Sequence, residues 1–140
     1  MSDHASAPST PEDCGPEISA LDAAVRLGSR AARVGFDWPT ASGARAKVAE
    51  ELDELDRAVT EESVARQEEE LGDLLFAIAS LARKLDLDPD RALRGSLARF
   101  QVRFAAVEGL ASGRGQPLDT LDAEALDALW CEVKRVESSR

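Results

Sequence analysis

Four carboxylates occur as two pairs with helical spacing in the middle of the sequence. Glu51 and Glu54 lie three residues apart in KVAEELDE, and Glu70 and Asp73 have the same spacing in EEELGDLLF. At 100° per residue, the members of each pair share one column on the shoulder of an apolar stripe. Lys47 lies one turn before Glu51 in the same column. If the two helices pack antiparallel, as their short connection favours, the two pairs face one another.

Facing carboxylates repel unless positive charge lies between them. Two unit charges about 5 Å apart cost on the order of 3 kcal/mol at an effective dielectric constant of 20. Lys47 can neutralise only one of the four charges, so a bound divalent cation is the simplest further source of positive charge. Oxygen ligands without a nearby histidine or cysteine favour Mg²⁺ or Mn²⁺. Spacing alone leaves a second interpretation open, in which both acidic columns are solvated helix faces.

The elements that must position these side chains are helices. β-Branched residues are sparse and tyrosine is absent, whereas Ala, Leu, Glu and Arg dominate. Apolar stripes and breakers predict five helices, at about residues 18–34, 43–59, 62–85, 89–110 and 122–136. Thr60 is the expected N-cap of the third helix, and Asp88 that of the fourth, with Pro89 at its first position. The expected fold class is therefore all-α, an antiparallel bundle of about five helices.

Composition restricts the class of protein further. The 140 residues suit one domain, expected over residues 18–137 after a disordered tail at residues 1–17. A net charge of −10 argues against binding nucleic acid through a basic surface. The only histidine, His4, lies in the tail, which removes most histidine-based chemistry. Two cysteines, no signal peptide and no apolar segment of membrane-spanning length predict a cytoplasmic protein.

The two acidic motifs resemble the E-x-x-E…E-x-x-D signature of the MazG-like nucleoside triphosphate pyrophosphohydrolases. Four further segments resemble the second, catalytic domain of tandem MazG proteins: RVGFDWPT at 33–40, LARKL at 81–85, RFQVRF at 99–104 and LWCEVKR at 129–135. The resemblance covers about residues 20–136. It implies a helical bundle that dimerises, and Mg²⁺-dependent hydrolysis of canonical or noncanonical (d)NTPs to NMP and pyrophosphate.

The resemblance also implies roles for individual residues. The metal ligands would be Glu51, Glu54, Glu70 and Asp73. Glu51 or Glu54 would orient or deprotonate the attacking water, with Lys47 beside them. The substrate-binding set would be Lys47, Arg99, Arg103, Trp130 and Lys134. One position departs from the family, since Leu97 stands where an asparagine is frequent, two residues before Arg99.

Other interpretations stay open for several of these residues and for the function. Arg99 and Arg103 could be surface charges, Trp130 could pack in the core, and Lys134 could cap a helix end. A relative of narrow specificity, resembling a dimeric dUTPase or a phosphoribosyl-ATP pyrophosphatase, is one alternative function. A catalytically degenerate dimeric interaction module is another, kept open by Leu97. A homodimer is expected in each case, with a tetramer as the alternative.

Overall fold

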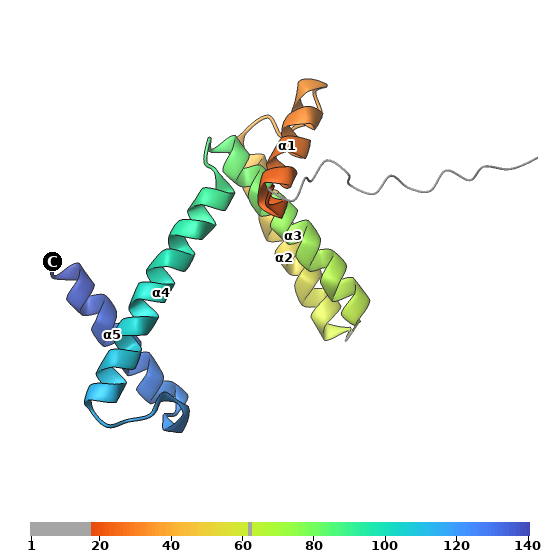
Figure 1. The fold of residues 1–140 in the computed structure, drawn as a ribbon. Coiled ribbons are helices and arrows are strands. Elements are labelled where there is room, and N and C mark those ends of the chain that lie inside the picture. The colour runs from red at the N-terminus through yellow and green to blue at the C-terminus, as the bar shows by residue number, and fades with distance from the viewer. Residues whose placement is uncertain (1–17, 62) are drawn as a thin grey trace, which may run out of the picture. The chain divides into compact units, whose positions relative to one another are not determined.

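A computed structural model describes residues 18–61 and 63–140, and the predicted tail at residues 1–17 lies outside them. The described elements are α1 (Ala20–Arg33), α2 (Ala41–Thr60), α3 (Val64–Lys84), α4 (Pro89–Gly113), the 3₁₀ turn η1 (Leu118–Thr120) and α5 (Ala123–Ser138) (Figure 1). No described residue lies in a strand. The all-α class is therefore confirmed, and the five predicted helices lie within a few residues of the observed ones.

Of the two helix N-caps predicted from the sequence, one is confirmed and the other is wrong. The amide of Arg91 donates to the Asp88 carboxylate at 3.1 Å, which confirms that cap for α4. The prediction for Thr60 is wrong, because Thr60 is the last residue of α2 and α3 begins at Val64. The Thr60 hydroxyl donates instead to the carbonyl of Asp56, one turn back along its own helix, at 3.0 Å.

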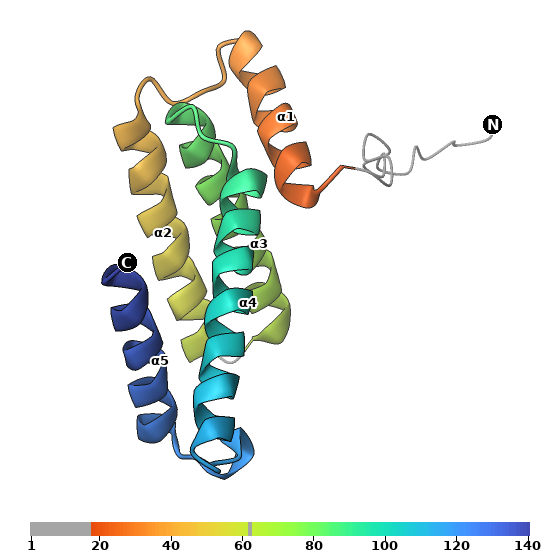
Figure 2. The ribbon, with the colours of Figure 1, turned by 60° about the vertical axis from the view of Figure 1, so that its left-hand side comes forward.

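The described residues form two compact units, the first ending at Arg91 and the second beginning at Ala92. In the first unit α2 and α3 lie side by side, and α1 packs against α3 (Figure 2). The short connection after Thr60 makes α2 and α3 antiparallel. The amide of Ser63 and the side-chain amide of Gln67 both donate to the carbonyl of Ala58, at 3.3 and 3.4 Å, which ties the start of α3 to the end of α2.

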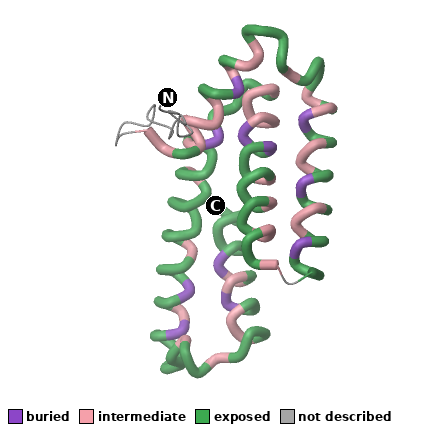
Figure 3. The backbone as a smooth tube through the Cα atoms, turned by 90° about the vertical axis from the view of Figure 1, so that its right-hand side faces the viewer, coloured by how far each residue is buried: buried purple, intermediate pink, exposed green. Residues whose placement is uncertain are grey.

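Small side chains form the buried interior of the first unit. The buried apolar residues of α2 and α3 are Ala44, Ala58, Ala77 and Ala79. Several larger apolar side chains of α3, among them Leu71, Leu75 and Ile78, are exposed, and Figure 3 shows how few described positions are buried. Helices with small buried residues can approach closely, which brings the side chains at their shoulders within reach of one another.

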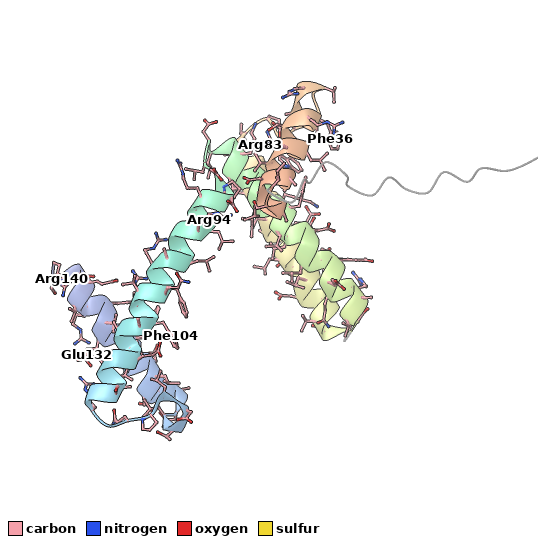
Figure 4. The ribbon with its side chains drawn as sticks, viewed as in Figure 1. Phe36, Arg83, Arg94, Phe104, Glu132 and Arg140 are labelled. Atoms are coloured by element: carbon pink, nitrogen blue, oxygen red, sulfur yellow. The ribbon has the colours of Figure 1, made fainter. Side chains whose placement is uncertain are left out.

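The second unit has its own core between α4 and α5. Its buried members are Val107 and Ala111 on α4 and Leu129 and Val133 on α5, and Trp130 is one of the half-buried side chains packed against them. Two ion pairs lie at the surface of this unit, one from α4 to α5 and one from the residue after α4 to α5. Arg103 contacts Glu137 and Arg114 contacts Glu132, each at 2.8 Å, and Figure 4 labels Glu132.

Two observations bear on the predicted location. Within the described residues, no helix combines the length and apolar character needed to cross a lipid bilayer. Cys131 is exposed and unbonded, and Cys14 lies outside the described residues. The cytoplasmic location stays a prediction from the sequence.

Candidate functional site

Three of the four predicted carboxylates come together where α2 packs on α3. Glu51 on α2 and Glu70 and Asp73 on α3 each place an oxygen within 4.8 Å of the other two. Glu51 is buried, with 7% of its surface exposed, whereas Asp73 is exposed and Glu70 is intermediate. We call these three side chains the carboxylate cluster. Its members come from two helices, so the antiparallel packing creates the cluster.

Two cations meet two of the three carboxylates. Lys47 forms a short ion pair with Glu51 and a second one, at 3.0 Å, with Glu50. The hydrogen bond to Glu51, and to a smaller extent the one to Glu50, raises the pKa of Lys47 to about 12. Lys47 therefore stays cationic at neutral pH. Arg66 lies 3.4 Å from Glu70. Asp73 has no cationic partner within the described residues.

Arg66 is a site residue that the sequence interpretation missed. It pairs with Glu61 as well as with Glu70, and it lies 4.0 Å from Glu54. The signal was present in the sequence, because Arg66 precedes Glu70 by four residues, as Lys47 precedes Glu51. A cation one turn before a carboxylate on the same helix faces it.

Glu54 lies outside the carboxylate cluster. Its carboxylate accepts a hydrogen bond from Arg57 at 2.6 Å, one turn further along the exposed side of α2. The role of Glu54 as a fourth metal ligand therefore stays a prediction. The carboxylate cluster supplies three of the four predicted ligands without it.

The donors of the carboxylate cluster fit a small divalent cation. All are carboxylate oxygens, which Mg²⁺ and Mn²⁺ prefer. Lys47 and Arg66 compensate Glu51 and Glu70, which leaves the charge of Asp73 uncompensated among the described residues. Mg²⁺ sites in enzymes commonly use few carboxylates and fill the remaining positions with waters and substrate phosphates. An exposed carboxylate beside a buried one suits such a half-open site.

A cavity of about 650 Å³ in the first unit opens beside the carboxylate cluster. Lys47, Glu51 and Asp73 contribute to its wall, and the remaining lining is largely apolar or aromatic. It comes from α1, from the turn between α1 and α2, and from α3, and includes Leu27, Ala31, Phe36, Trp38, Phe76 and Ala77. The lining thus joins hard oxygen donors to aromatic surface within one cavity.

The turn that carries Phe36 and Trp38 is held to α3 by an ion cluster. Arg83 donates to the Asp37 carboxylate at 2.6 and 3.1 Å, and Lys84 donates to it at 3.2 Å. These contacts, with Arg83 the largest cause, hold the pKa of Asp37 well below its usual range, although burial works in the opposite direction. Figure 4 labels Phe36 and Arg83, at the same end of the unit. The sequence interpretation included Trp38 and Asp37 only as part of the segment RVGFDWPT and assigned neither a role of its own.

The remaining predicted site residues lie in the second unit. Arg99 and Lys134 are exposed, and Arg103 donates to Glu137 at 2.8 Å. Trp130 packs against the core of this unit, with its ring centroid 5.4 Å from that of Phe100. The packing role considered for Trp130 is therefore observed. The substrate-binding roles of all four residues stay predictions.

The comparisons with known proteins agree with the motifs. Residues 40–107 match the family model described as the MazG nucleotide pyrophosphohydrolase domain. The chain thus carries a MazG domain, and the resemblance drawn from its motifs is confirmed. The match begins at the residue before α2 and includes all three members of the carboxylate cluster.

Curated relatives give the same family. The chain is 41% identical over 119 residues to the nucleoside triphosphate pyrophosphohydrolase/pyrophosphatase MazG of Thermotoga maritima, which covers 85% of this chain and 46% of that protein. It is 38% identical over 130 residues to a nucleoside triphosphate pyrophosphohydrolase of Escherichia coli, which covers 90% of this chain and 49% of that protein. The chain spans about half the length of these two relatives.

Proposed function

We propose that this chain is a Mg²⁺-dependent nucleoside triphosphate pyrophosphohydrolase, whose substrates are canonical or noncanonical (d)NTPs. Water would cleave the bond between the α-phosphoryl group and the β-phosphate, giving NMP and pyrophosphate. The convergence of Glu51, Glu70 and Asp73 inside a MazG domain is the observation that carries this proposal. The names of the relatives from Thermotoga maritima and Escherichia coli, both nucleoside triphosphate pyrophosphohydrolases, support it. The domain would extend over residues 18–137.

The carboxylate cluster would hold Mg²⁺, with Glu54 as the predicted fourth ligand. When bound, Mg²⁺ supplies a Lewis acid and neutralises charge on the triphosphate. The chain's own contribution is to hold the carboxylates in place. Lys47 fixes Glu51 through their ion pair and remains cationic at the wall of the cavity, where it can also face a phosphate oxygen.

The attacking water would be oriented by Glu51 or Glu54. The carboxylate would accept a proton from the water while the oxygen of the water bonds to phosphorus. The bridging oxygen would leave with pyrophosphate. Arg99, Arg103 and Lys134 would stabilise negative charge on the phosphates. Trp130 would contact the nucleotide. These four assignments rest on the resemblance of their sequence segments.

We also propose that the chain acts as a homodimer, with a tetramer as the alternative. The support is the apolar surface that the described helices leave uncovered. On α3, Leu71, Leu75 and Ile78 are 41–49% exposed, and on α4, Leu97 and Phe100 are more than half exposed. A second copy would cover such faces. Light scattering that gives only the monomer mass at micromolar concentration would contradict the dimer.

A substrate panel tests the activity. Pyrophosphate release is measured with the eight canonical NTPs and dNTPs, dUTP and 8-oxo-dGTP, in Mg²⁺ and in EDTA, with a thermal melt in both conditions. We expect metal-dependent NMP and pyrophosphate, and a higher melting temperature in Mg²⁺. Turnover of one substrate alone would favour the narrow-specificity alternative. If neither turnover nor the melt responds to Mg²⁺, the acidic columns are solvated faces and the proposal fails.

A further inference from the structure

The cavity beside the carboxylate cluster presents aromatic side chains that the fold itself does not pack. Phe36 is 82% exposed, Phe76 is 42% exposed and Trp38 is 40% exposed, and all three line the cavity. A phenylalanine at 82% exposure contributes little to the stability of its own unit. Exposed aromatic surface in a concave site is characteristic of ligand binding.

The aromatic side chains are held in position before any ligand arrives. Asp37 lies between Phe36 and Trp38 in the sequence and is fixed to α3 by Arg83 and Lys84. The amide of Trp38 donates to the Asp37 carboxylate at 2.8 Å. The Trp38 ring also lies over Gly43, where a Cβ would be 3.5 Å from the indole. A turn anchored in this way loses little conformational freedom on binding.

The polar groups of the lining are unsuited to reading the edge of a base. Asp37 and Arg83 are engaged with each other, and Lys47 and Glu51 form an ion pair. Asp73 belongs to the carboxylate cluster that is proposed to hold the metal. Ser80 is the lining residue with an uncharged polar side chain. A planar ligand here would be recognised by its faces, through stacking and apolar contact, and only weakly by its hydrogen-bonding pattern.

The position of this surface relative to the acids selects the kind of ligand. Asp73, Phe76, Ser80 and Arg83 line the cavity along one helix, so the lining extends about 15 Å along α3 at 1.5 Å per residue. One part of the wall thus bears the acids proposed to hold the metal and triphosphate. The rest offers flat aromatic surface. A molecule with a polyanionic end and a planar aromatic end fits both.

We propose that this cavity is the nucleobase subsite of the chain, with Phe36 and Trp38 contacting the faces of the base. The proposal rests on the proposed function, because it takes the carboxylate cluster as the place where the triphosphate is held. Because the subsite would contact the faces of the base rather than its edges, it should bind different bases with similar affinity. Removal of one stacking side chain should weaken binding of a nucleotide about tenfold to a hundredfold.

The first experiment compares a ligand with a base and a ligand without one. Binding of α,β-methylene-ATP and of inorganic tripolyphosphate is measured by calorimetry in Mg²⁺ for the wild type, Phe36→Ala and Val34→Ala. Val34 is a matched control, since it is 83% exposed, lies two residues away and does not line the cavity. We expect Phe36→Ala to weaken the nucleotide about tenfold and to leave tripolyphosphate unchanged. Val34→Ala should change neither.

The second experiment uses the two tryptophans, Trp38 and Trp130. Trp130→Phe leaves Trp38 as the sole emitter, and Trp38→Phe leaves Trp130. We expect α,β-methylene-ATP, but not tripolyphosphate, to quench the emission of Trp38. Quenching confined to Trp130 would place the base elsewhere and overturn the subsite.

The outcomes separate the subsite from the activity. Pyrophosphate release with equal nucleotide affinity in Phe36→Ala and wild type would keep the enzyme and overturn the subsite. Selective loss of nucleotide binding in a chain that releases no pyrophosphate would keep the subsite and overturn the activity. If Phe36→Ala turns a dimer into a monomer, as light scattering would show, a second copy covers this surface and the subsite is overturned.

Discussion

The guanidinium of Arg83 donates two hydrogen bonds to the carboxylate of Asp37, at 2.6 and 3.1 Å, and the two residues are 46 positions apart in the sequence. Lys84 adds a third contact to the same carboxylate. Asp37→Asn should lower the melting temperature by several degrees, because the amide keeps one acceptor but removes the charge that both cations face. Asp119→Asn, at an exposed position of η1, is the control and should leave the melt unchanged. Equal melting temperatures for wild type and Asp37→Asn would show that the ion cluster contributes nothing.

The same contact predicts how stability depends on pH. Because the pKa of Asp37 is lowered in the folded chain, its contribution is fully present above the unfolded value of about 3.9 and is lost as pH falls below it. The stability difference between wild type and Asp37→Asn should therefore be constant from pH 7 to about pH 5 and shrink at lower pH. Chemical denaturation at a series of pH values measures it. A difference that persists unchanged at pH 2 would contradict the assignment.

Gly28 is a point of close approach between α1 and α3. A Cβ at this position would lie 3.0 Å from Nε of Arg83, which the ion pair with Asp37 holds in place. Gly28→Ala should destabilise the chain by about 1–3 kcal/mol, as overpacking does. At Gly109, within α4, a Cβ would meet nothing within 4 Å, so Gly109→Ala should be neutral or stabilising by up to about 1 kcal/mol. Denaturant titrations should show a lower free energy of unfolding for Gly28→Ala and no loss for Gly109→Ala. A stabilising Gly28→Ala would refute the close approach.

Glu50 and Glu51 form a matched pair for the metal site. Both contact Lys47, but only Glu51 is buried and belongs to the carboxylate cluster. Glu51→Gln should reduce pyrophosphate release at least about 100-fold and abolish the effect of Mg²⁺ on the melt. Glu50→Gln should retain both. An equal loss of pyrophosphate release in the two variants would show that activity depends on the negative charge near Lys47 rather than on metal ligation by Glu51.

Arg66 should compete with a bound cation for Glu70. In the absence of metal its guanidinium partly neutralises that carboxylate. Arg66→Ala should therefore lower the melting temperature in EDTA and increase the stabilisation by Mg²⁺, since the ion then meets less compensated charge. Melts over a range of Mg²⁺ concentrations test this. A smaller Mg²⁺ effect in the variant would show that Arg66 supports metal binding.

Local patterns in the sequence predicted the helices and the spacing of the acids, although they misplaced the Thr60 cap and Arg66 was overlooked. Apolar stripes predicted the helices, and the three-residue spacings placed Glu51, Glu70 and Asp73 on facing shoulders once α2 and α3 packed antiparallel. The partners of these acids were harder to predict. Glu54 pairs with Arg57, and Arg66 lies within 4.0 Å of three glutamates. A long side chain can form ion pairs of similar energy with several neighbours, so the sequence does not select one partner. The cavity was missed because its lining combines residues of α1, the following turn, α2 and α3, which no periodicity within one helix reveals.

The alanines buried in the first unit have a consequence beyond packing. Apart from Glu51, the buried residues of α2 and α3 are Ala44, Ala58, Ala77 and Ala79. The bulk of the side chains between two helices sets the distance between their axes. Because the carboxylate cluster draws its oxygens from both helices, that distance also limits the radius of an ion that all three can share. Mg²⁺ binds oxygen at about 2.0–2.1 Å and Ca²⁺ at about 2.3–2.6 Å. An alanine that lies between the two axes would therefore limit the size of the shared ion, and a valine in its place would favour the larger ion.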